Sequence, residues 1–386
     1  MPDGGLFREA RFRDVHLYQR YAESLLHGHV PYRDFFMEYP PGALAVFMPA
    51  TLGGADHYNA LFKASMALCG AAALVLVTAI LVRLGASCAR LWAAASLIAL
   101  SPVALGPISL NTYDAWPALL TVAALAALLT GRDVGACALL GIAFAAKVYP
   151  LVLLPPALVW AARRRGTRAA KSGAAAFAVA ALACVLPFLV LAPQGLLESF
   201  RSQAARGLQI ESLGAQVVVA AHHVTGYGVS VAHHTRGAVS YDVRGPVATA
   251  LGALSSLLQL AAVAIVVWAY ARRGDDPRRL AVAFAAAVAG FLAFTRFLSP
   301  QYLVWLVPLV PFVPGIATFV VFAAALALDQ AWFFHYRSIV ELGSRSWFVL
   351  ARDLLLVVVF ALALRHTMKH EDAVVLEDEL PLGVPP

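Results

Sequence analysis

The chain has 386 residues, of which 61% are hydrophobic and 13% are charged, and its formal net charge is +7. A soluble domain carries about 25% charged residues, so this composition excludes a soluble enzyme, a secreted disulfide-rich protein and a disordered protein. The apolar runs are long and unbroken, which argues against a transmembrane β-barrel. Membrane proteins carry excess Lys and Arg in their cytoplasmic loops, so the positive charge does not indicate a nucleic-acid partner.

The chain begins with a polar and aromatic segment. In the first half of residues 12–41, Asp14, Tyr18, Tyr21 and Leu25 recur at helical spacing on one face, which predicts an amphipathic helix. The proline-containing second half predicts an ordered loop. An interfacial helix with aromatic anchors explains this pattern without any catalytic role. An interfacial helix does not explain why acidic residues gather in this segment. The short apolar piece that follows, at 42–52, is expected at the membrane interface.

Apolar runs of about 20 residues predict membrane-spanning helices. Eight such runs lie at 59–84, 90–108, 115–130, 172–192, 246–270, 280–298, 316–334 and 347–365. Three shorter segments lie at 134–146, 149–162 and 302–313. The expected fold is therefore all-α, a polytopic membrane protein with about 11 membrane helices, including short hairpin helices.

The segments 134–146 and 149–162 form a predicted hairpin. Arg132 precedes it and a basic run at 163–171 follows it, so both ends are expected on the cytoplasmic side. Lys147 then lies at the apex of the hairpin, where a charge needs water or a negative partner. The same rule places residues 1–41, 109–114, 193–245, 296–301 and 335–346 outside the cytoplasm.

These outer segments hold most of the polar side chains. Each of their features has an ordinary structural explanation: Asn111 and Asp114 suit a helix N-cap, Lys147 suits a lysine that reaches water, and residues 200–214 suit a solvated amphipathic helix. Two His pairs lie at 222–223 and 233–234. Without suitable Cys or carboxylate partners they favour a polar loop over a zinc site, and no metal is expected.

Several outer motifs occur together in a recognisable order. They are Asp-Val-His-Leu-Tyr at 14–18, Pro-Tyr-Arg-Asp-Phe at 31–35, Glu-Tyr-Pro-Pro at 38–41, Tyr113-Asp114, Gly141 through Lys147-Val-Tyr-Pro, Arg206-Gly-Leu-Gln-Ile-Glu211 and Ser299-Pro-Gln-Tyr302. This order resembles glycosyltransferase family GT87, whose members have the GT-C fold and include mannosyltransferases that use polyprenyl-phosphate mannose.

The resemblance implies an inverting transfer of a sugar, with mannose the expected one. The donor is a polyprenyl-phosphate sugar, the acceptor is a glycolipid or glycan, and no cofactor is expected. It implies Asp14 as the base, with Asp34 as the alternative. Cations expected to bind the donor phosphate are Lys147, Arg206 and Arg296. Residues expected to bind sugar or acceptor are Tyr18, Asp34, Glu38, Tyr39, Asp114, Glu211, Gln301 and Tyr302.

The sequence departs from the family pattern in two places. Family members have a membrane helix before the first outer loop, and restoring one would raise the eleven expected segments to twelve. They also carry a His pair after the Ser-Pro, where this chain has Gln301 and Tyr302, so the acceptor and the donor sugar stay open.

The expected organisation is one domain over residues 1–365, with an acidic, disordered cytoplasmic tail at 366–386. The expected location is the plasma membrane, with membrane lipids as partners, no nucleic acid, and the active site on the extracytoplasmic face. Two alternatives remain: a multi-pass lipid or sugar transporter or flippase, and an inactive relative with a structural role.

Overall fold

The computed structural model describes residues 14–234 and 240–369, and within them it is a bundle of helices with one small sheet. Within these described residues, seven helical segments are long and apolar enough to cross a membrane. They are Pro41–Arg83, which contains α3 (Gly54–Arg83), then α4 (Cys88–Leu105), α9 (Thr167–Leu191), α12 (Pro246–Arg272), α13 (Pro277–Phe294), α14 (Ile316–Phe333) and α16 (Ser346–Met368). The predicted all-α membrane fold is confirmed.

The shorter elements lie between these helices. In chain order they are α1 (Asp14–Leu26), η2 (Pro41–Ala43), α2 (Leu44–Phe47), η3 (Pro49–Gly53), α5 (Ile108–Asn111), α6 (Ala115–Leu129), α7 (Asp133–Ala146), η4 (Tyr149–Leu153), α8 (Leu154–Arg165), α10 (Pro193–Ala204), β1 (Leu208–Gln209), α11 (Leu213–Thr225), β2 (Ser230–His234), β3 (Ser240–Arg244), η5 (Pro300–Trp305), η6 (Val310–Phe312) and α15 (Tyr336–Val340). The run predicted at 115–130 becomes the 15-residue α6, which is shorter than a full span.

Helix α13 forms the centre of the bundle. Of its apolar stretch 78% is buried, compared with 11% for α9, whose side chains are left facing outward. Helices α12 and α16 pack against α13, and α14 packs against α16. A helix that is apolar all round and buried belongs in a core, whereas the exposed apolar surface of α9 suits contact with lipid.

The predicted hairpin is present. Helices α7 and α8 flank Lys147 and η4, and Arg165 at the end of α8 pairs with Asp133 at the start of α7. This ion pair joins the two open ends of the hairpin. It leaves Lys147 at the opposite end, where the backbone becomes extended before it enters η4.

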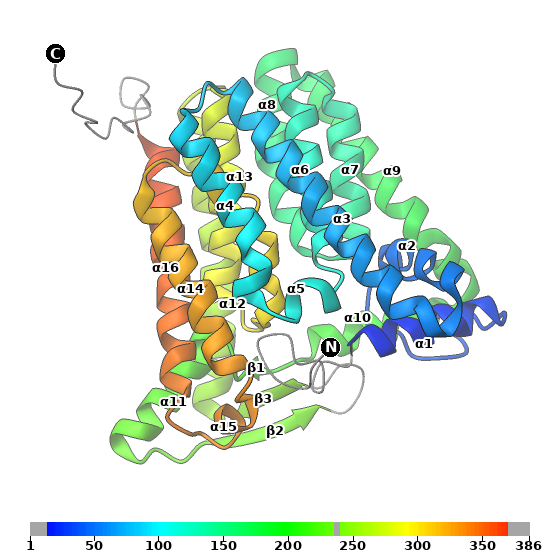
Figure 1. The fold of residues 1–386 in the computed structure, drawn as a ribbon, viewed down its shortest axis with the longest axis vertical. Helices are drawn as coiled ribbons and strands as arrows, with labels where there is room; N and C mark the ends of the chain where they lie inside the picture. The colour runs from blue at the N-terminus through cyan, green and yellow to red at the C-terminus, as the bar shows by residue number, and fades with distance from the viewer. Residues whose placement is uncertain (1–13, 235–239, 370–386) are drawn as a thin grey trace.

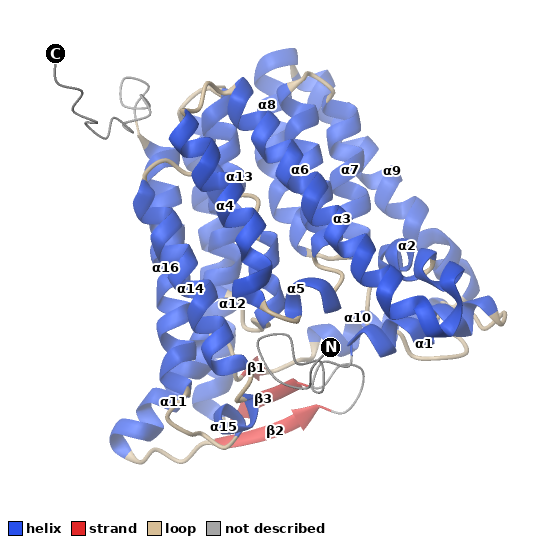
Figure 2. Ribbon diagram, viewed as in Figure 1, coloured by secondary structure: helices blue, strands red, loops and turns tan. Residues whose placement is uncertain are grey.

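Most of the predicted outer segments gather at one end of the bundle. Helices α1, α10, α11 and α15 and the sheet lie together at the lower end of Figure 1. The region of the His pairs, predicted as a polar loop, instead lies in α11 and in antiparallel strands whose order is β1-β3-β2, and α10 precedes this region (Figure 2). The predicted tail starts inside α16, which continues to Met368, and the positions after 369 lie outside the described residues.

Helices α7 and α9 approach so closely that one position requires glycine. A Cβ atom on Gly141 would lie 2.4 Å from the carbonyl oxygen of Phe177 in α9. A Cβ atom on Gly135, also in α7, would meet nothing within 4 Å.

We therefore expect Gly141→Ala to lower the thermal unfolding midpoint of the detergent-purified protein, because the two helices must separate; overpacking of this kind costs about 1–3 kcal/mol. The matched control Gly135→Ala should hold or slightly raise the midpoint, since alanine favours a helix by roughly 0.5–1 kcal/mol. Equal midpoints for the two variants would contradict the close approach of the helices.

Candidate active site

A cavity of about 1450 Å³ lies among the elements gathered at the lower end of the bundle. Its walls come from α1, the loop before η2, the Lys147 turn, α10, the segment from Arg206 to Glu211, η5 and the start of α15. Polar side chains that line it include Asp14, Arg20, Glu38, Lys147, Gln203, Arg206, Gln209, Glu211, Ser240, Gln301, Tyr302 and Tyr336. Segments distant in sequence therefore supply polar side chains to a single cavity.

Asp14 is the first residue of α1, and it lines the cavity. Val15, Tyr18, Tyr21 and Ala22 form the buried face of this helix. The Tyr18 ring stacks on Phe47 of α2, with ring centroids 4.4 Å apart. This packing fixes the start of α1 at the cavity wall.

The surroundings of Asp14 raise its pKa to about 7. The largest cause is burial, which penalises the charged carboxylate, and the second is repulsion from Glu38; the positive charge of Lys147 acts in the opposite direction. A carboxyl group with a pKa near neutrality can accept a proton and release it again, which is what a general base requires.

Lys147 is held at the cavity wall by a carboxylate and three aromatic rings. Its Nζ lies 2.5 Å from Asp114 Oδ1, and the side chain of Lys147 is 12% exposed. The Nζ also lies 4.5, 5.1 and 5.2 Å from the ring centroids of Tyr113, Tyr302 and Trp305. Cation–π attraction adds to the ion pair, so the ammonium is stabilised while it faces the cavity.

Asp114 is also held by a second donor. Trp305 Nε1 donates to Asp114 Oδ1 at 2.5 Å, and the Trp305 ring stacks on Tyr149 and on Tyr302 with centroids 4.1 and 4.2 Å apart. The start of α6, the turn after α7 and η5 therefore converge on one carboxylate. This explains why Tyr113-Asp114, Lys147-Val-Tyr-Pro and Ser299-Pro-Gln-Tyr302 lie together despite their separation in sequence.

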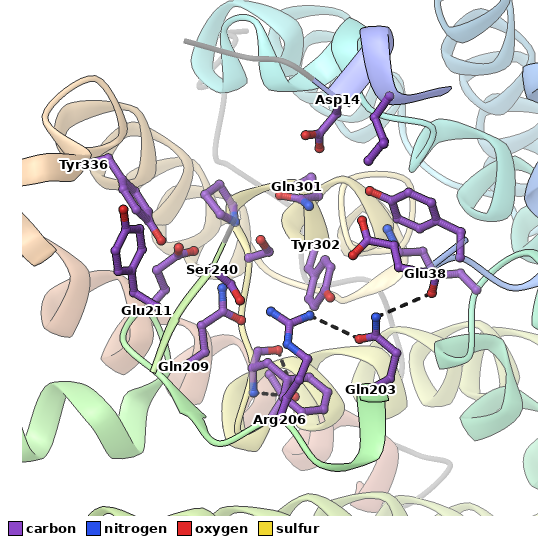
Figure 3. A pocket seen from close by; sticks show the side chains of 18 of the residues that line it. Asp14, Glu38, Gln203, Arg206, Gln209, Glu211, Ser240, Gln301, Tyr302 and Tyr336 are labelled. Carbon is purple, nitrogen blue, oxygen red and sulfur yellow. Dashed lines mark hydrogen bonds between the residues drawn. The ribbon is translucent and has the colours of Figure 1, made fainter. Parts of the chain in front are cut away.

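Arg206 lies between the two ends of the cavity (Figure 3). Its Nη1 donates to Gln203 Oε1 at 3.2 Å, and Gln203 Nε2 donates to the carbonyl oxygen of Glu38 at 3.5 Å. The guanidinium also lies over the Phe297 ring at 5.4 Å. Arg206 thus supplies a second cation to the cavity.

Eight of the twelve predicted site residues line the cavity: Asp14, Glu38, Tyr39, Lys147, Arg206, Glu211, Gln301 and Tyr302. The other four are not among its lining residues. Asp114 lies behind Lys147, Tyr18 is on the buried face of α1 and stacks on Phe47, and Arg296 donates to the carbonyl oxygen of Ala204 at 2.7 Å. Asp34 is bonded to the exposed Arg33, an interaction that lowers the pKa of Asp34 to about 2.

Sequence reasoning missed several polar residues of the site. Gln209 lies inside the Arg206–Glu211 motif, two residues before Glu211, and this alternation could have pointed to it. Sequence reasoning also missed a buried ionic cluster in α14 and α16, in which Arg352 contacts Asp329 at 2.6 Å and Asp353 at 2.8 Å. Charged residues within apolar spans were the available signal.

The two rings of the first His pair bond different partners. The His222 ring bonds the carbonyl oxygen of Tyr227, and the His223 ring bonds the hydroxyl of Ser346. Within residues 14–234 and 240–369, no group of three or more His, Cys, Asp or Glu side chains could hold a metal ion.

Comparison with protein families identifies the class of enzyme. Residues 36–295 match glycosyltransferase family 87. The chain belongs to this family. It is therefore a membrane glycosyltransferase, with a sugar donor and an acceptor as substrates. No curated protein matched the chain in the comparison. The family match includes Lys147, Arg206 and Glu211, whereas Asp14 and η5 lie beyond its limits.

The Lys147–Asp114 pair makes a testable energetic prediction. We expect Lys147→Met to lower the free energy of unfolding by about 3–5 kcal/mol, because it leaves a buried carboxylate without its cation. The double variant Lys147→Met/Asp114→Asn should recover most of the loss. Thermal unfolding in detergent measures both, and an equally large loss in the double variant would show that the two groups are not coupled.

Proposed function

We propose that this glycosyltransferase transfers mannose from a polyprenyl-phosphate donor to an extracytoplasmic glycolipid or glycan, with inversion and with Asp14 as the base. The observation that carries the proposal is that Asp14 and Lys147 face the same cavity from separate elements. One can accept a proton near neutral pH, and the other can stabilise a phosphate.

The reaction proceeds in one displacement. Asp14 takes the proton of an acceptor hydroxyl as its oxygen attacks the anomeric carbon of the donor sugar. The bond from that carbon to the phosphate oxygen breaks, and polyprenyl phosphate leaves with the electron pair. Lys147 and Arg206 stabilise the negative charge that develops on the leaving group. Glu38, Tyr39, Gln301 and Tyr302 are placed to contact sugar hydroxyls.

The arrangement of charge supports the proposed topology. The basic run Arg163, Arg164 and Arg165 ends the hairpin at the end opposite Lys147. Short basic loops stay in the cytoplasm, so the cavity opens on the extracytoplasmic side of the plasma membrane. A lipid-linked donor then reaches the cavity from the bilayer. Family membership favours this enzyme over a transporter or flippase.

The first test compares two aspartates in sugar transfer from radiolabelled polyprenyl-phosphate mannose by isolated membranes. Asp14→Asn should lower transfer by roughly 10²–10⁴-fold, the usual contribution of a general base. Asp34→Asn should retain transfer, because Asp34 is exposed and bonded to Arg33. The opposite pattern would make Asp34 the base. Absence of transfer by the wild type would favour another donor sugar or an inactive relative.

The pH dependence provides a second test. Because the pKa of Asp14 is raised to about 7, the carboxylate that acts as base exists mainly above that pH. The value of kcat/KM should therefore be half-maximal near pH 7, fall at lower pH and level off at higher pH. Glu38→Gln should shift this limb to lower pH, since the repulsion that helps raise the pKa is removed. If the pH at which kcat/KM is half-maximal is the same in Glu38→Gln as in the wild type, Asp14 is excluded as the titrating group.

A further inference from the structure

The end of the cavity away from Asp14 has a different chemistry. Glu211, Gln209, Ser240 and Tyr336 surround it on one side of Figure 3, while Asp14 and Glu38 lie on the other side, with Arg206, Gln301 and Tyr302 between. Glu211 and Gln209 are 2% and 3% exposed, so both are buried although they line the cavity. Acceptor oxygens are concentrated at this end.

The backbone that carries Gln209 and Glu211 is rigidly held. Strand β1 pairs with β3, and the neighbouring Gly207 N–H donates to Asp242 Oδ2 at 2.8 Å. Gln216 Nε2 donates to the carbonyl oxygen of Ile210 at 2.5 Å. Binding sites retain their geometry when the surrounding structure fixes each residue.

Arg352 provides the strongest of these constraints. Its Nη2 donates to the carbonyl oxygen of Glu211 at 2.7 Å, and its guanidinium is in turn held by Asp329 and Asp353 within α14 and α16. All three charged side chains are fully buried. Buried charges are costly unless they are paired, so this cluster makes the position of the Glu211 backbone depend on two membrane helices.

Two side-chain atoms at this end lack a hydrogen-bond partner within the protein. They are Gln209 Oε1 and Glu211 Oε2. An unpaired buried acceptor costs about 1–3 kcal/mol, and a ligand that brings hydroxyl donors would satisfy both atoms. Burial raises the pKa of Glu211 to about 7, so above that pH its carboxylate repels a phosphate. The ligand suited to this end is therefore a neutral polyol.

We propose that Glu211 and Gln209 form a subsite for a sugar ring of the acceptor that does not itself react. Adjacent hydroxyls of this ring donate to Glu211 Oε2 and Gln209 Oε1, while the reacting hydroxyl lies at Asp14. The cavity volume of about 1450 Å³ exceeds the roughly 300–1,000 Å³ of a pocket for one drug-sized ligand, so it can hold the donor head group and the acceptor together. The identity of the ligand as the acceptor, and the placement of its reacting hydroxyl at Asp14, rest on the proposed function.

Direct binding tests the subsite without catalysis. The probe is mannotriose, titrated into the full-length protein in detergent without donor and followed by saturation-transfer NMR. We expect Glu211→Gln and Gln209→Leu each to weaken binding by about 10-fold or more, the usual effect of losing a well-placed hydrogen bond to a charged or buried group. The matched control Glu198→Gln, an exposed carboxylate on α10 outside the cavity lining, should bind as the wild type does.

Steady-state kinetics then separates this subsite from the donor site. With octyl mannobioside as acceptor, Glu211→Gln should raise the acceptor KM about 10-fold and leave the donor KM unchanged. A rise in the donor KM would overturn the proposal, as would wild-type protein that does not bind mannotriose. Asp14→Asn should bind mannotriose normally, so failure of the proposed base and failure of the subsite give different results.

Discussion

The site depends on one largely buried charge. Lys147 lies at the end of a short hairpin inside an apolar bundle, where its ammonium group requires a negative partner. Asp114 pairs with the Lys147 ammonium, and Tyr113, Tyr302 and Trp305 surround it. These partners come from two separate regions of the chain, residues 113–114 and residues 302–305. A charge in apolar surroundings is tolerated only when such partners are held in place, so stabilising one lysine also assembles the wall of the cavity.

The cavity combines three kinds of chemistry in one continuous volume. A carboxyl group with a raised pKa lies at one end, cations from the α7 turn and the α10–β1 connection lie at the wall and in the middle, and buried hydrogen-bond acceptors lie at the other end. This order suits the proposed transfer reaction, in which a proton, a phosphate and a polyol are held at separate points. Arg352, in the ionic cluster of α14 and α16, bonds the backbone of Glu211 and so ties the end of the cavity that has the buried acceptors to two membrane spans.

The predicted elements differed in how well the sequence specified them. The long apolar helices and the α7–α8 hairpin were predicted because hydropathy and the placement of basic residues are local properties. The region of the His pairs was predicted as a polar loop, yet it lies in α11 and in a sheet. Short amphipathic helices and five-residue strands carry a weak periodic signal, and strand β1 has only two residues. Their structure depends on tertiary packing.

The sequence by itself determined the membrane class, the position of seven of the eight predicted spans, and the motifs that resemble glycosyltransferase family 87. It also identified Asp14, Lys147 and Arg206 as chemically suited groups. Only the tertiary structure decided which of the predicted site residues line the cavity. Three of those that do not are Asp34, which lies exposed beside Arg33, Arg296, which bonds a backbone carbonyl, and Asp114, which pairs with Lys147. The physical reason is that residue type specifies what a side chain can do, whereas burial and neighbours from distant segments determine its pKa, its partners and its access to substrate.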